Sequence, residues 1–230
     1  MMQDPTFVQK AFASIAPRYV LANHVLSGGI DVMWRRRVAA MAAALHPQRI
    51  LDLATGSGDL AAAVGAACPE AQVIGADFCA PMMAHARRRG LPHLVVADGM
   101  ALPFAAGVFD LVTVGVGLRN TADYGGAARE MARVLRPGGT LMVLDFSQPA
   151  PWLRGAYKLY LHRILPLLAG ALTGERGAYE YLGGSIEQFP SGPAMNALLN
   201  SHGFADPQWI PLTGGIASLY IAQKPLAPQG

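Results

Sequence analysis

The sequence predicts an α/β fold with a mostly parallel, seven-stranded sheet and helices on both faces. Between residues 49 and 146, short apolar runs alternate with helix-like stretches, the pattern of strand–helix–strand units that build covered parallel sheets. A glycine-rich turn follows the first of these runs. The last two apolar runs, over 207–212 and 218–224, are most simply a terminal antiparallel pair.

Composition favours one globular domain over residues 1–230. Of these 230 residues, 52% are hydrophobic and only 14% are charged, which is ample material for a core. The arginine runs 35–37 and 87–89 lie within helical patterns and lack interleaved aromatic residues, so we interpret them as solvated helix faces and expect no nucleic-acid partner. Cys68 and Cys79 have neither metal-ligand nor disulfide spacing and fit a reduced, cytoplasmic protein.

No stretch of the sequence has the character of a signal peptide or a membrane span. Acid and amide side chains precede any apolar run at the N-terminus. The most membrane-like stretch, 164–172, is about half the length that a bilayer requires and contains Pro166. We therefore expect a cytoplasmic location, with peripheral contact at the inner face of the membrane left open.

Residues 1–46 precede the alternating pattern and are predicted to form a helical N-terminal lid. Asp31 is the predicted N-cap of a helix that Pro47 ends. Apolar residues recur at helical spacing along it and predict a core-facing stripe: Trp34, Val38, Met41 and Leu45.

The central elements follow in order. Strands are predicted over 49–54, 72–77, 93–98, 109–115 and 140–146, and helices over 59–68, 80–89 and 121–135. Thr121 is a candidate N-cap for the last helix, and Pro137 with the two following glycines is expected to break it.

A helical insertion over 148–190 interrupts the alternation after the fifth strand, and a helix over 192–203 follows it. Its apolar residues are too many for a narrow stripe: Leu159, Leu161, Ile164, Leu165, Leu167, Leu168 and Leu172. They could line a groove for an apolar substrate or rest on a bilayer. A buried helix pair or a homodimer interface would explain them equally well.

The turn after the first strand belongs to the segment LDLATGSGD, over 51–59. Gly56, Gly58 and Ala61 satisfy the dinucleotide fingerprint G-x-G-x-x-G/A, so an NAD-dependent oxidoreductase is one alternative. Asp59, however, would stand at the helix start where a pyrophosphate binds, and Asp52 adds a second carboxylate. These charges favour a cationic ligand without phosphate, such as S-adenosyl-L-methionine.

Acidic residues also follow the second and third strands. Asp77 lies roughly 20 residues after the turn, where a carboxylate accepts the two ribose hydroxyls of a nucleoside, although a helix N-cap is the alternative. Asp98 could contact the adenine amino group, with Gly99 giving clearance. Parallel strands present their carboxyl ends at one edge, which is where such sheets bind ligands.

Several segments resemble the ubiquinone/menaquinone biosynthesis C-methyltransferases. The residues that carry the resemblance are LDLATGSGD, GADF, GLRN and EMARVLRPGGTLMVLDFSQP in the core, and LSGGIDVMWRR and YEYLGGSIEQFP outside it. The resemblance implies a Rossmann-like class I methyltransferase fold that transfers a methyl group to a ring carbon of a polyprenylated quinol, either demethylmenaquinol or a methoxy-polyprenyl-benzoquinol. Ser57 stands where the family usually has threonine, Gly115 where it often has serine, and Val20 where it usually has aspartate.

The charge pattern and the resemblance together give the predicted contacts. The cofactor-binding residues are Asp52, Thr55, Gly56, Ser57, Gly58, Asp59, Asp77, Phe78, Asp98, Gly99 and Gly115. The predicted catalytic residues are Arg119, Asn120 and Tyr19. No metal is expected, because no His/Cys/Asp cluster has ligand spacing.

Arg119 would stabilise negative charge on a ring hydroxyl, and a water held with Asn120 would relay the proton, since an arginine is a poor base. The alternative for Arg119 is a structural clamp onto a carbonyl or Asp110. Tyr19 could orient the ring or simply pack, and His24 or His162 could act as base or be ordinary surface histidines.

Two further readings stay open. A methyltransferase acting on another small molecule would keep the fold and the cofactor. A non-catalytic protein that retains the methyltransferase shell to bind quinones or partners would keep the fold and the cofactor affinity without turnover.

Overall fold

The computed structural model describes residues 29–167 and 183–226, together with the single residues 27 and 170. Its sheet contains seven strands in the order β3-β2-β1-β4-β5-β7-β6. Their bounds are β1 Arg49–Leu53, β2 Gln72–Asp77, β3 His93–Val96, β4 Phe109–Gly115, β5 Leu135–Phe146, β6 Ala205–Leu212 and β7 Ala217–Gln223. The first five strands pair in parallel, and β7 runs antiparallel to both β5 and β6, which confirms the predicted sheet.

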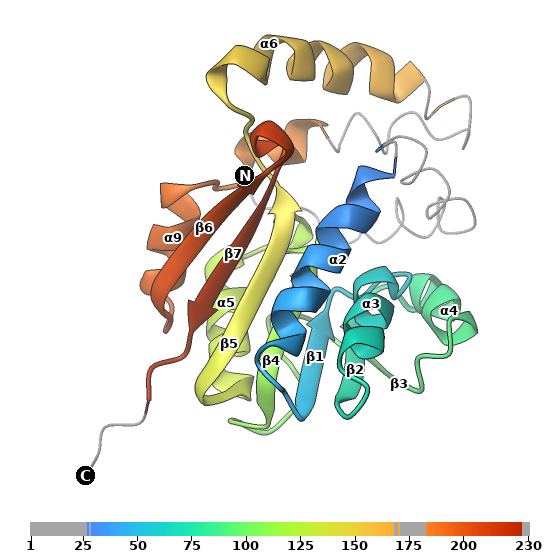
Figure 1. The fold of residues 1–230 in the computed structure, drawn as a ribbon, viewed down its shortest axis with the longest axis vertical. Helices are drawn as coiled ribbons and strands as arrows, with labels where there is room; N and C mark the ends of the chain where they lie inside the picture. Colours follow the sequence, from blue (N-terminus) through green and yellow to red (C-terminus); the bar gives the residue numbers. More distant parts are fainter. Residues whose placement is uncertain (1–26, 28, 168–169, 171–182, 227–230) are drawn as a thin grey trace.

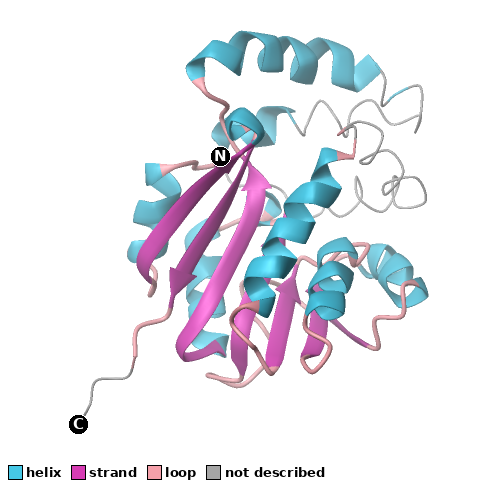
Figure 2. Ribbon diagram, viewed as in Figure 1, coloured by secondary structure: helices cyan, strands magenta, loops and turns pink. Residues whose placement is uncertain are grey.

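Helices cover both faces of this sheet (Figures 1 and 2). α2 (Ile30–Ala43) and α3 (Asp59–Ala67) bury one apolar cluster with Ile50, Leu111 and Met142. α5 (Tyr124–Val134) and α9 (Pro193–Asn200) bury a second cluster with Val112 and Val143. Neighbouring residues of β4 and β5 thus enter opposite cores, as the two-residue period of a strand covered on both faces requires.

The strand order reverses between β1 and β4, which defines the switch point of the sheet. From β1 the chain proceeds outward through β2 and β3, with α4 (Ala80–Arg88) between them, and then returns to β4 on the other side of β1. The loops after β1 and β4 diverge at such a point and leave a crevice at the carboxyl edge of the strands. The described residues of the predicted site lie at the carboxyl ends of these strands or in the segments that follow them.

Two predicted helix caps are wrong. Gly29, with a φ of 78°, precedes α2, and Asp31 lies inside the first turn, where Arg35 and Ser27 donate to its carboxylate. Asp123 rather than Thr121 caps α5 through a bond from the Gly125 amide.

Two boundaries also differ from prediction. α5 ends at Val134, and β5 starts at the next residue, so Pro137 lies within the strand. The predicted stripe on α2 holds for Trp34 and Val38, which are buried, whereas Leu45 lies beyond the helix end and is exposed.

The insertion is helical where the structure describes it. α6 (Pro151–Leu159) continues into the π-helical turn η2 (Tyr160–Ile164), and residues 183–188 form a further helix. Tyr157, Leu161, Leu165 and Ile186 form a small core of their own. Figure 1 shows α6 above the carboxyl edge of the sheet. The predicted lid up to residue 26, with Tyr19 and His24, lies outside the described residues, as does most of 168–182. Among the described residues, no helix combines the length and apolar character that crossing a membrane requires.

Candidate active site

The glycine loop joins β1 to α3 and contains two left-handed glycines. Gly56 and Gly58 have φ values of 53° and 79°, a region that side chains with a Cβ rarely adopt. A Cβ on Gly58 would also lie 2.5 Å from Leu91 Cδ1 and 2.9 Å from Ala86 Cβ. Gly58 therefore allows the start of α3 to approach the end of α4, a packing role that the sequence did not reveal.

Asp59 does not present the free charge that the sequence analysis expected. Its carboxylate lies 2.8 Å from the Arg89 guanidinium and also accepts a hydrogen bond from the Ser57 hydroxyl. Because Arg89 offsets this charge, Asp59 alone would not repel a phosphate. Only more deeply buried carboxylates can favour a cationic ligand here.

Asp52 is such a carboxylate. It is only 1% exposed, and the Thr113 hydroxyl donates to it at 2.6 Å. Burial raises the pKa of Asp52 to about 6, with the nearby charge of Asp77 adding to the shift. Across the described ranges, no basic side chain forms an ion pair with either carboxylate. Buried carboxylates without a cation suit a positively charged ligand.

Asp77 ends β2 and ties the glycine loop to the start of α4. Its Oδ2 accepts from the Gly56 amide at 2.7 Å, and its Oδ1 accepts from the Cys79 amide at 2.8 Å. Burial raises the pKa of Asp77, and these amide bonds oppose the rise. The alternative of a helix N-cap is wrong, because Cys79 rather than Asp77 is the N-cap of α4. Asp77 binds the Gly56 and Cys79 backbone amides instead.

The third acid is more exposed than the other two. Asp98 follows β3, and its Oδ1 accepts from the Met100 amide at 2.9 Å. A Cβ on Gly99 would meet Leu53 at an ordinary 3.6 Å, so packing within the protein does not require a glycine there. Phe78 is half-buried beside Asp77, and the parallel pairing of β2 with β3 brings these residues to one edge.

The departure at position 115 has a steric explanation. A Cβ on Gly115 would lie 2.9 Å from Leu60 Cδ2, so Leu60 occupies the space that a serine side chain would need. Thr55, in the glycine loop after β1, is also buried and lies near the Asp52 carboxylate.

Arg119 lies in the short 3-10 helix η1 (Leu118–Asn120) that follows β4 and its terminal turn. It is 3% exposed, and its Nη1 donates to the Val116 carbonyl at 2.8 Å and to Asp145 Oδ1 at 2.7 Å. The predicted carbonyl clamp is therefore present, but the alternative of Asp110 as partner is wrong. Asp110 lies near the amino end of β4 and binds the Gln48 amide and Arg136 instead.

Aromatic side chains surround Arg119. Its guanidinium carbon lies 5.2 Å from the centre of the Phe146 ring, which Trp34 contacts edge-on at 6.0 Å. Trp34 Nε1 in turn donates to the Thr213 hydroxyl. Burial raises the pKa of Tyr157 on α6, and the positive charge of Arg119 opposes that rise. Trp34 of α2 is thereby linked to Arg119 through the Phe146 ring.

Strained backbone marks the switch point. Ala54 and Val116, which follow β1 and β4, have φ values of 53° and 59° although neither is glycine. A Cβ on Gly117 would lie 2.5 Å from Ala54 Cβ. The two loops therefore touch here, and position 117 has no room for a side chain.

Sequence reasoning missed Gly117 and Asp145. Asp145 lies next to the end of the fifth strand, as Asp52, Asp77 and Asp98 lie at or near the ends of the first three. Applying the same rule to the segment LDF would have identified it.

Asn120 and His162 have different surroundings. Asn120 is half-buried next to Arg119. His162 faces Glu187 at 3.3 Å in a largely exposed pair, which favours an ordinary surface role. Within the described part of the chain, no group of three or more His, Cys, Asp or Glu residues could hold a metal.

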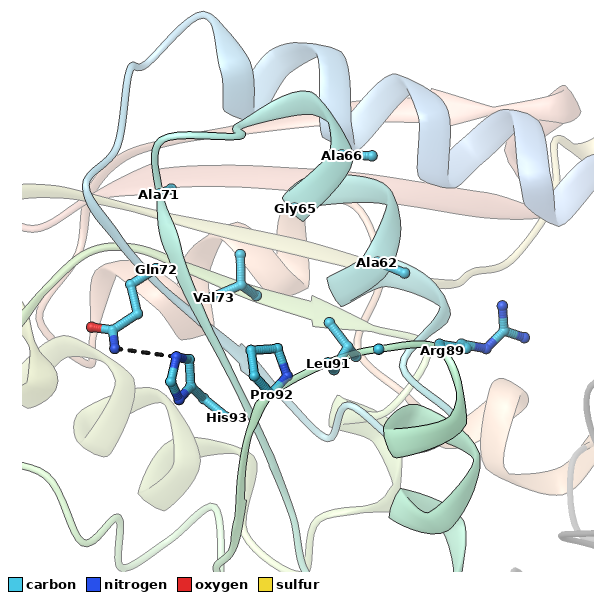
Figure 3. Close-up of a pocket in the computed structure, with 11 residues that line it drawn as sticks. Ala62, Gly65, Ala66, Ala71, Gln72, Val73, Arg89, Leu91, Pro92 and His93 are labelled. Atoms are coloured by element: carbon cyan, nitrogen blue, oxygen red, sulfur yellow. Dashed lines mark hydrogen bonds between the residues drawn. The ribbon is translucent and has the colours of Figure 1, made fainter.

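A separate hollow lies at the opposite edge of the sheet (Figure 3). Its volume is about 320 Å³, and it is lined by Gln72 and His93 at the amino ends of β2 and β3, together with small apolar residues of α3. Because the acids gather at the carboxyl ends, this hollow is not the cofactor site.

Comparisons with known proteins identify the family of this chain. A demethylmenaquinone methyltransferase from Thermus thermophilus is 47% identical over 220 residues, covering 93% of this chain and 100% of that protein. The ubiquinone/menaquinone biosynthesis C-methyltransferase UbiE from Syntrophotalea carbinolica is 40% identical over 225 residues, covering 94% of this chain and 93% of that protein. The structure of an O-methyltransferase family protein from Burkholderia thailandensis superposes with a TM-score of 0.66 at 15% identity, covering 91% of this chain and 60% of that one. The family model of the ubiE/COQ5 methyltransferases matches residues 1–224. The chain therefore belongs to the ubiE/COQ5 methyltransferase family and is an S-adenosylmethionine-dependent methyltransferase.

Proposed function

We propose that this enzyme methylates a ring carbon of a polyprenylated quinol, with demethylmenaquinol as its first substrate and a methoxy-polyprenyl-benzoquinol as the second candidate. The observation that carries the proposal is a buried arginine, Arg119, at the same sheet edge as the unpaired carboxylates of Asp52 and Asp77. The relative from Thermus thermophilus is named a demethylmenaquinone methyltransferase, and the match covers its whole length. This name supports the naphthoquinol ring as the substrate.

The donor set fits S-adenosylmethionine. Asp52 and the glycine-loop residues Thr55 to Asp59 would hold the positively charged end, and Asp77 would accept the ribose hydroxyls. Asp98, Gly99 and Phe78 would border the adenine, with Gly115 on the β4 side. When bound, the cofactor supplies a methyl group on a positively charged sulfur.

Arg119 is proposed to favour the deprotonated form of a ring hydroxyl, because a quinol ring carbon is a weak nucleophile until that proton leaves. Its Nε has no hydrogen-bond partner among the described residues, so one buried donor remains after the Asp145 and Val116 contacts. A guanidinium has too high a pKa to act as the base itself. We assign the proton relay to a water held between Arg119 and Asn120, and the orientation of the ring to Tyr19.

An assay on both rings tests this function. Purified protein with labelled S-adenosylmethionine should methylate demethylmenaquinol, and turnover on the benzoquinol measured beside it gives the ring preference. If protein that binds S-adenosylhomocysteine methylates neither quinol, the proposed substrate class is rejected and the alternatives are another small molecule or a non-catalytic role. Affinity for NAD without affinity for S-adenosylhomocysteine would instead indicate an oxidoreductase.

We also propose that α6 and η2 contact an anionic membrane surface from which the apolar substrate is taken. Tyr157, Leu161 and Leu165 face the small core, while the outward side exposes apolar side chains: Trp152 at 79%, Leu159 at 58% and Leu167 at 60%. Residues 151–167 carry three basic side chains, Arg154, Lys158 and Arg163, and no acidic one. An apolar helix face with basic flanks and a tryptophan is the character of an interfacial helix.

Sedimentation with lipid vesicles tests this contact. The protein should bind phosphatidylglycerol vesicles more tightly than phosphatidylcholine vesicles, and Trp152→Glu with Leu159→Glu should abolish binding. The control is the single substitution Leu226→Glu, which adds one acidic side chain at an exposed leucine that follows β7. If the wild-type protein ignores both vesicles but sediments as a dimer that the α6 variant dissociates, the surface is a homodimer interface.

A further inference from the structure

The ion pair between Arg119 and Asp145 is the most deeply buried in the described part of the chain, with side chains 3% and 0% exposed. We propose that Asp145 is a positioning residue for catalysis, which fixes the orientation of Arg119 without touching the substrate. This inference rests on the proposed role of Arg119 in methyl transfer.

The sheet register places Asp145 beneath Arg119. β4 and β5 run parallel with Gly115 opposite Leu144, so the next residue of β5 faces the turn that leads into η1. Asp145 Oδ1 accepts from Arg119 Nη1 at 2.7 Å, and its Oδ2 accepts the Arg119 backbone amide at 3.4 Å. One carboxylate thus holds both the backbone and the guanidinium of the same residue.

Asp145 is itself held by its own strand. The Phe146 amide donates to Asp145 Oδ1 at 2.8 Å, which fixes the carboxylate relative to the sheet. The Phe146 side chain leaves the strand on the other face, where its ring lies 5.2 Å from the guanidinium carbon. The Val116 carbonyl provides a third contact at 2.8 Å. A flexible side chain is thereby held at three points that all belong to β4, β5 or the turn between β4 and η1.

Stability does not explain this arrangement. Replacing a buried ion pair by well-packed apolar residues is often neutral or stabilising, because desolvation offsets the Coulombic attraction. A cation in a fixed orientation is, however, what stabilising charge on a reacting ring would require, since a misplaced group can cost on the order of 100-fold in rate. The buried Nε without a partner among the described residues is the donor that this orientation would direct.

Steady-state kinetics with demethylmenaquinol and S-adenosylmethionine test the proposal on Asp145→Asn and Asp145→Glu. In Asp145→Asn, kcat should fall by on the order of 10- to 100-fold, while the KM for the cofactor and the affinity for S-adenosylhomocysteine stay within about twofold. Asp145→Glu restores the charge and should give an intermediate kcat. Glu130→Gln is the matched control: it removes the carboxylate that binds Arg133 on α5, and its kcat should equal that of the wild type.

A substrate-free measurement separates this proposal from the proposed function. In the ¹⁵N NMR spectrum of arginine side chains, Arg119 Nε–H should exchange slowly in the wild type and rapidly in Asp145→Asn. Loss of this protection together with wild-type kcat in folded Asp145→Asn would overturn the positioning role. If Asp145→Asn does not fold, Asp145→Glu decides, and a kcat equal to the wild type would overturn it. Absence of quinol methylation by the wild type would instead reject the proposed function, with the NMR comparison still reporting on the coupling.

Discussion

Replacing Asp52 by asparagine should stabilise the folded protein at neutral pH and weaken cofactor binding. The substitution keeps the shape of the side chain and an oxygen that can accept the Thr113 hydroxyl, but it removes the buried charge. The two effects have opposite signs because the carboxylate is unfavourable in the fold and favourable only beside a cationic ligand.

The magnitude follows from the pKa of Asp52. The difference between about 6 in the folded protein and its ordinary value of 3.8 corresponds to about 3 kcal/mol. Since the folded-state pKa is raised, the contribution to stability is fully present below about pH 4 and is lost as the pH rises through 6. The wild type should therefore lose about 3 kcal/mol relative to the variant between these limits.

Urea denaturation of both proteins from pH 4 to pH 8 measures this change. The exposed Glu70→Gln variant removes an equal charge without the burial and serves as the control. Calorimetry at pH 7.5 should show affinity for S-adenosylhomocysteine reduced about 10- to 100-fold in Asp52→Asn, from the loss of one charge-assisted bond. A stability difference that stays constant across this pH range would refute the reasoning.

Three other substitutions give sharp outcomes. Gly117→Ala should lower the melting temperature and cofactor affinity together, because its Cβ would lie 2.5 Å from that of Ala54; unchanged scanning calorimetry would contradict the steric argument. Arg119→Ala should destabilise the fold by about 3 to 5 kcal/mol, since it leaves Asp145 buried and unpaired. It should also abolish turnover while cofactor binding is retained. Denaturation measures the first effect and kinetics the second, and a wild-type rate would remove Arg119 from the mechanism. Asp77→Ala should reduce cofactor affinity by at least about 10-fold, as two backbone amides lose their acceptor along with the ribose hydroxyls; titration calorimetry would reject this role if affinity were unchanged.

The cofactor was predicted correctly from the sequence, but one of the residues behind that prediction does not have the expected free charge. The acids near the glycine loop predicted a cationic ligand, and the family assignment confirms S-adenosylmethionine. The acid that weighed most, Asp59, is paired with Arg89, a residue 30 positions later in the chain that no local pattern connects to it. Asp52 and Asp77 carry the argument instead, because burial rather than sequence position decides which charge lacks a partner.

By itself, the sequence determined the alternation of strands and helices, the glycine loop, the acids at the strand ends and the family. These features depend on local periodicity and on residue types at fixed spacing, which the order of residues records directly. Only the tertiary structure decided that Arg119 pairs with Asp145 rather than Asp110, that Gly117 must be a glycine, and that Trp34 reaches the site through Phe146. Each of these contacts joins residues from different elements, and their partners are fixed by strand order and register, which arise when the sheet assembles.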